Sequence, residues 1–135
     1  MRLLIDTNIV LEVILEQAKA EEARALLVKT EKHEFFISDY ALHSIGLLLF
    51  RRKQHSVFQQ FLNDMMLRAG MTVVSLSVED MGSVIEAAQR FNLDFDDAYQ
   101  YAVAGRYGLT VVSFDADFDR TERGRKTAGE MLVEE

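Results

Sequence analysis

The chain has 135 residues, of which 49% are hydrophobic and 27% charged, and its net charge at pH 7 is −7. These totals fit one globular domain, residues 1–135, and disfavour a general nucleic-acid coat protein, which would be basic. The sequence has no cysteine, which excludes disulfides and thiolate zinc sites, and no apolar run near the ~20 residues that cross a bilayer. We therefore expect a cytoplasmic protein without a membrane partner.

Short apolar segments rich in β-branched and aromatic residues recur along the chain. They predict strands at residues 2–5, 34–38, 71–76 and 109–114. Apolar residues spaced three and four apart predict helices between them, around Val13, Ala23 and Ile45 and at about residues 57–68.

Two further helices complete the pattern. Ser77 opens one of them, and Asp80 forms a capping box with it. The predicted buried stripe of this helix is Met81, Val84, Ile85 and Ala88. The other helix covers about residues 96–107. Gly108 is well placed to end it, and Gly70 to end the helix at 57–68.

This alternation of strands and helices is typical of a three-layer α/β/α sandwich. We expect a mostly parallel central sheet of four to five strands, covered by helices on both faces. In such sheets, active groups gather beyond the carboxyl ends of the strands.

Aspartates lie at three places that this fold brings to one edge of the sheet. Asp6 follows the first predicted strand, and Asp115 and Asp117 follow the last. Asp97 lies in the first turn of the helix that leads to the last strand. Singly, each acid is better explained as a helix cap or a turn residue. Together they predict a site for Mg²⁺ or Mn²⁺, because carboxylate oxygens suit these hard ions.

Two stretches resemble a known family. "LLIDTNIVLEVI" resembles the opening strand and helix of PIN-domain ribonucleases, and "LDFDDAYQYAVAGRYGLTVVSFDADFDR" resembles their closing signature. The resemblance implies metal-dependent hydrolysis of RNA phosphodiester bonds with Mg²⁺ or Mn²⁺. Asp6, Asp97 and Asp115 match the family's catalytic, metal-binding acids, and Asp117 matches an additional acid at the margin of the metal site. Thr7 and Ser113 match supporting hydroxyl positions.

The resemblance also implies partners. The chain has the length of many PIN toxins of toxin–antitoxin pairs, so an antitoxin partner and a homodimer are expected. Candidate residues for a dimer face, for which core packing is the alternative, are Leu47, Phe50, Phe58 and Phe61.

One family acid is missing. The family usually has a glutamate in the helix after the second strand, and His43 or Ser44 stands there in this sequence. Three readings remain open: His43 substitutes, the aspartates suffice, or the nuclease is weakened. The last reading leads to an alternative function, a PIN-fold module that binds RNA or an antitoxin without cleavage.

Two basic segments interrupt the acidic sequence. The alternative for both segments is a solvated helix or loop end. The candidate contacts to an RNA backbone are Arg51, Arg52, Arg120, Arg123, Arg125 and Lys126.

"VVSFDADF" also resembles the Asp-x-Asp motif of phosphatases that use an aspartyl nucleophile. Too little chain follows Asp117 to complete such a site, and no suitably placed lysine supports a phosphoacceptor receiver domain.

Overall fold

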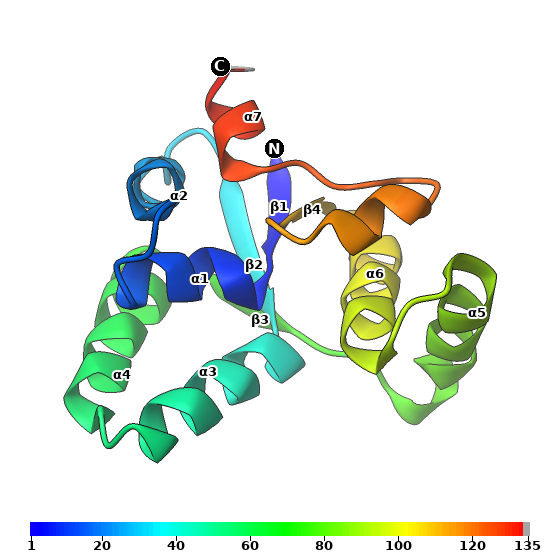
Figure 1. The fold of residues 1–135 in the computed structure, drawn as a ribbon, viewed down its shortest axis with the longest axis horizontal. Helices are drawn as coiled ribbons and strands as arrows, with labels where there is room; N and C mark the ends of the chain where they lie inside the picture. Colours follow the sequence, from blue (N-terminus) through cyan, green and yellow to red (C-terminus); the bar gives the residue numbers. More distant parts are fainter. Residues whose placement is uncertain (134–135) are drawn as a thin grey trace.

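A central sheet of parallel strands organises the computed structural model, which describes residues 1–133. Within these residues the sheet has four strands in the order β3-β2-β1-β4, all parallel (Figure 1). The strands are β1 (Arg2–Ile5), β2 (Glu34–Ser38), β3 (Thr72–Val74) and β4 (Thr110–Val112). The prediction of a mostly parallel sheet is confirmed, and β3 and β4 are shorter than expected.

Helices connect the strands. The first three are α1 (Thr7–Ile14), α2 (Ala20–Leu27) and α3 (Asp39–Arg51). The helix predicted at 57–68 is an α-helix, α4 (His55–Phe61), that continues into the π-helix η1 (Leu62–Arg68). The remainder are η2 (Val78–Asp80), α5 (Met81–Phe91), α6 (Phe95–Tyr107), η3 (Ala116–Arg120) and α7 (Ala128–Val133).

Two apolar cores lie on opposite faces of the sheet, because successive strand residues point to opposite sides. Leu3, Ile5 and Ile37 pack with the helices from α1 to α4 and with α7. Leu4 and Val111 pack with α5 and α6. Figure 1 shows α5 and α6 on one side of the sheet and α1 to α4 on the other. The three-layer α/β/α architecture is therefore confirmed.

The predicted helix ends are largely observed. Ser77 and Asp80 form the expected capping box, and the backbone N–H of Ser77 donates to Oδ2 of Asp80 over 3.1 Å. Gly108 ends α6 with a left-handed φ of 65°, and Gly70 has a φ of 73° just after η1. Both positions suit glycine because a Cβ would strain this backbone.

The predicted buried stripe of α5 is wrong at one position. Ile85 is 58% exposed, whereas Val84 and Ala87 are buried. Since successive helical residues are about 100° apart, a helix that packs on α6 through Val84 and Ala87 turns Ile85 away.

A segment from the C-terminal part of the chain lies along the outer edge of β4. Lys126 forms a single parallel bridge with Val112. Its N–H donates to the carbonyl of Val111, and its carbonyl accepts from the N–H of Ser113, both over 2.9 Å. This rung is where a fifth strand would lie. Within residues 1–133, no helix is long and apolar enough to cross a membrane.

Candidate metal centre

The register of the sheet brings together the residues that follow β1 and β4. Ile5 lies opposite Val112, and the N–H of Asp6 donates to the carbonyl of Val112 over 3.0 Å. Asp6 and Ser113 are therefore neighbours at the carboxyl ends of adjacent strands, as the fold rule predicts.

Asp6 caps α1 and is buried among hydrogen-bond donors. Oδ1 accepts from the N–H of Thr7 over 2.8 Å and from Nε2 of Gln100 over 2.9 Å. Oδ2 accepts from Oγ of Ser113 over 2.7 Å and from Nδ2 of Asn8 over 3.4 Å. Burial raises the pKa of Asp6, while the bonds from Ser113, Gln100 and Thr7 oppose that rise.

Three other predicted acids form a tight cluster. Asp97, from the first turn of α6, Asp115, which caps η3, and Asp117, in the first turn of η3, each offer a ligand atom within 4.8 Å of the others. The cap holds the start of η3, because Oδ1 of Asp115 accepts from the N–H of Asp117 over 2.9 Å. The set is all oxygen, and its chemistry fits a hard dication.

Asp6 is a neighbour of this cluster and is not part of it. It lines the same cavity as Asp97, and its charge is one of those that act on Asp97. The resemblance implies that Asp117 lies at the margin of the site, whereas the geometry groups Asp117 with Asp97 and Asp115.

The carboxylates of the cluster and its neighbours repel one another. Burial, followed by the charges of Asp115, Asp94 and Asp6, raises the pKa of Asp97 to about 8. A bound cation would offset this repulsion and lower the pKa of Asp97, because it favours the ionised carboxylate that burial and the neighbouring charges oppose.

The two residues that stand where the family usually has a glutamate, His43 and Ser44, line different cavities. Ser44 lines a cavity of about 230 Å³ together with Asp6, Asp97 and Gln100. His43 lines a separate apolar hollow of about 510 Å³ with Leu47 and Phe50. The two side chains separate because consecutive helical residues point about 100° apart, and it is Ser44 that lies in the cavity with the acids.

The predicted RNA contacts fall into two groups. Arg51 and Arg52 are exposed at the end of α3. Arg120 donates to the carbonyls of Phe91 and Asn92 over 3.1 and 2.7 Å, and it pairs with Asp117 over 3.2 Å.

The other arginines of the C-terminal segment hold its loops. Arg125 donates to the carbonyl of Ser113 and pairs with Asp119, both over 3.1 Å. The guanidinium of Arg123 lies 3.9 Å from the centre of the Tyr101 ring and donates to the Tyr101 carbonyl over 2.7 Å. Lys126 lies in the bridge to β4.

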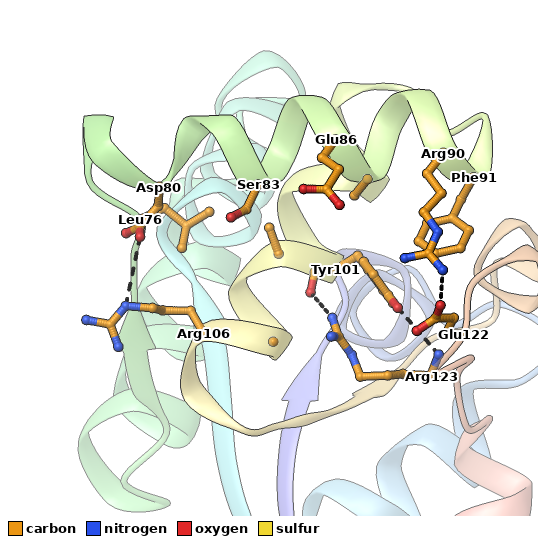
Figure 2. A pocket seen from close by; sticks show the side chains of 13 residues that line it. Leu76, Asp80, Ser83, Glu86, Arg90, Phe91, Tyr101, Arg106, Glu122 and Arg123 are labelled. Atoms are coloured by element: carbon orange, nitrogen blue, oxygen red, sulfur yellow. Dashed lines mark hydrogen bonds and ion pairs between the residues drawn. The ribbon is translucent and has the colours of Figure 1, made fainter.

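Figure 2 shows Arg123 in a third cavity, between α5 and α6. Its volume is about 380 Å³, and charged pairs rim it, namely Asp80 with Arg106 and Arg90 with Glu122. None of the clustered aspartates lines this cavity.

Two polar residues of the site were missed as site residues. Gln100 bonds to Asp6, and Asn8 bridges Asp6, Ser113 and the N–H of Phe114. Gln100 gave a signal in the sequence, as an amide one helical turn after Asp97 on a helix of small and apolar residues. Asn8 looked like an ordinary member of a helix-cap cluster.

Solved structures of similar fold include a toxin and a toxin–antitoxin complex. A toxin–antitoxin complex from Klebsiella pneumoniae has a TM-score of 0.70 and 21% identity, covering 93% of this chain and 96% of that one. VapC20 from Mycobacterium tuberculosis, described as a toxin that cleaves the sarcin–ricin loop, has a TM-score of 0.71 and 22% identity, covering 87% and 92%. FitAcB from Neisseria gonorrhoeae has a TM-score of 0.68 and 21% identity, covering 94% and 98%.

Comparison with curated protein sequences gives no match. The family profile described as the PIN domain matches residues 3–124, which include every acid of the candidate metal centre. The chain therefore belongs to the PIN domain family.

Proposed function

We propose that this protein is a Mg²⁺- or Mn²⁺-dependent ribonuclease that hydrolyses RNA phosphodiester bonds, and that it is the toxin of a toxin–antitoxin pair in the cytoplasm. The observation that supports the nuclease is the convergence of Asp97, Asp115 and Asp117 beside Asp6, from segments far apart in the sequence.

The proposed roles follow from the geometry. Asp97, Asp115 and Asp117 would hold the ion. When bound, such an ion lowers the pKa of a water molecule and neutralises charge that grows on the phosphate. Asp6 adds negative charge from a carboxylate whose orientation is fixed by Thr7, Ser113 and Gln100. Since burial and neighbouring acids raise the pKa of Asp97, loading the site at neutral pH releases a proton.

We propose that Arg51 and Arg52 contact the RNA backbone directly. Arg120, Arg123, Arg125 and Lys126 remain candidates, but their described bonds hold the loop that presents Asp115 and Asp117. Their loss would therefore change RNA binding and loop structure together.

The apolar hollow between α3 and α4 is the proposed dimer or antitoxin surface. Leu47 and Phe50 are 50% and 56% exposed there, and Phe58 is half-buried beside them. Phe61 is buried in the core and does not contribute to this surface. The Klebsiella relative is a toxin–antitoxin complex, which supports an antitoxin partner for this chain.

The decisive experiment is RNA cleavage with Mn²⁺ by the wild type and by Asp97→Asn. We expect cleavage by the wild type, a loss of at least a hundredfold in the variant, and no cleavage in EDTA. The matched control is Asp64→Asn. It removes an exposed acid that forms an ion pair with Arg68, and it should leave cleavage unchanged.

A second candidate function is a binding module without cleavage. The observation that favours it is Ser44, which faces the acids where the family usually has a glutamate and brings no carboxylate. Folded wild type that binds RNA and Mn²⁺ without cleaving would establish this alternative and exclude the ribonuclease.

A further inference from the structure

Gln100 is a buried amide inside the candidate metal centre. Its side chain is 2% exposed, and it lines the same cavity as Asp6, Asp97 and Ser44. It lies three residues after Asp97 on α6, so both side chains project to the same side of the helix. Nε2 donates to Oδ1 of Asp6 over 2.9 Å.

The other half of the amide has no partner. Among the described residues, the buried side-chain oxygens without a hydrogen bond are Oε1 of Gln54 and Oε1 of Gln100. Gln54 precedes α4 and does not line the acidic cavity. A buried acceptor without a donor is unfavourable, and a donor on a bound water or ligand would satisfy it.

The orientation of this amide is fixed by Asp6. Turning it over would place Oε1 against Oδ1 of Asp6, and two acceptors would then face each other. Oε1 therefore points away from Asp6 while Nε2 holds it.

We propose that Gln100 is a positioning residue of the metal centre: Nε2 fixes Asp6, and Oε1 accepts a hydrogen bond from a water in the coordination shell of the ion. The inference rests on the proposed metal-dependent function. Mg²⁺ usually keeps several waters when it binds to carboxylates, and each such water is a strong donor.

The amide also suits the charge of the site. Asp97 already lies among Asp94, Asp115 and Asp6, and these charges oppose its ionisation. A neutral acceptor orients a water without adding another negative charge. Gln100 thus supplies an oxygen in a cavity where Ser44 replaces the family glutamate.

The first test is Mn²⁺ binding by calorimetry to the wild type and to Gln100→Met, which keeps side-chain length and removes both polar atoms. We expect the dissociation constant to rise about tenfold, the range found when a partner of a metal site's ligands is lost. Melting in EDTA should show that the variant is folded. A dissociation constant within twofold of the wild type would overturn the proposal.

The second test needs no variant. A crystal structure of the wild type with Mn²⁺ should show Oε1 within hydrogen-bond distance of a water on the ion. An ion at the acids with no such water near Oε1 would overturn the contact and leave only the hold on Asp6. Wild type that binds no Mn²⁺ would instead overturn the proposed function itself.

Discussion

The hydroxyl of Ser113 donates to Oδ2 of Asp6 over 2.7 Å, although 107 positions separate the two residues in the chain. Oγ of Ser113 also accepts from Nδ2 of Asn8 over 3.1 Å and from the N–H of Asp115 over 2.9 Å. A single buried hydroxyl thus ties the end of β1 to the loop that carries Asp115.

We predict that Ser113→Ala weakens both the fold and the site. Removing Oγ takes a donor from Asp6 and leaves two donors without their acceptor, so the free energy of unfolding should fall by about 1–3 kcal/mol. Mn²⁺ affinity should fall about tenfold, because partners that orient metal ligands have effects of that size. Urea denaturation and calorimetry measure the two quantities. Ser83→Ala, at an exposed serine of α5, is the control and should change neither.

The metal-free protein should be more stable at pH 5 than at pH 8. The pKa of Asp97 rises from 3.8 to about 8 on folding, so the folded state holds this proton more tightly than the unfolded state. The resulting stabilisation is fully present below pH 4 and is lost as the pH rises towards 8. Burial raises the pKa of Asp6 as well, which acts in the same direction.

Urea denaturation in EDTA at the two pH values checks this prediction. Asp97→Asn should be less sensitive to pH, since it removes the main titrating group. Equal or greater wild-type stability at pH 8 would show that the carboxylates are not crowded in solution.

Mn²⁺ should stabilise the protein at pH 8. At a free concentration one hundred times the dissociation constant, an ion that binds only the folded state adds about 2.7 kcal/mol, or roughly 10 °C in Tm for a chain of this size. Thermal unfolding with Mn²⁺ and with EDTA measures the shift. Asp115→Asn should lose most of it, and Asp64→Asn should retain it.

The sequence predicted the α/β alternation, the parallel sheet and the aspartates at the strand ends, because strand periodicity and acids after apolar runs are local signals. It did not predict that Asp117 joins Asp97 and Asp115 while Asp6 lies beside them, since that depends on side-chain directions at the start of α1 and in η3. Local patterns also gave no preference between His43 and Ser44. The packing of α3 decides which of them faces the acids.

Ser44→Glu should restore a carboxylate to the acidic cavity. We expect the metal-free protein to become less stable, because another negative charge joins a crowded group, and Mn²⁺ affinity to rise about tenfold. His43→Glu is the matched control, since its side chain lines the apolar hollow and should leave Mn²⁺ affinity unchanged. Melting in EDTA and calorimetry distinguish the two variants. Equal effects at both positions would contradict the described orientation of α3.

Arginine substitutions should separate structural roles from RNA contacts. Arg123→Ala removes a guanidinium stacked on Tyr101 and bonded to its carbonyl, and should lower the free energy of unfolding by about 1–2 kcal/mol. Arg52→Ala, at an exposed position, should leave stability within about 0.5 kcal/mol of the wild type. It should instead weaken RNA binding and reduce its salt dependence by roughly one charge. Denaturation and RNA titrations at several salt concentrations check both expectations.

The pairing of Lys126 with the edge of β4 turns the intervening loop into a closed ring. Both ends of that ring are fastened to the same strand, so Asp115 and Asp117 are presented by backbone that has already lost most of its freedom on folding. Such preorganisation lowers the entropy cost of binding an ion, because its ligands are already ordered. A chain that ended just before Lys126 would keep Asp97, Asp115 and Asp117 but would lose the backbone bonds that hold the segment after β4 in place.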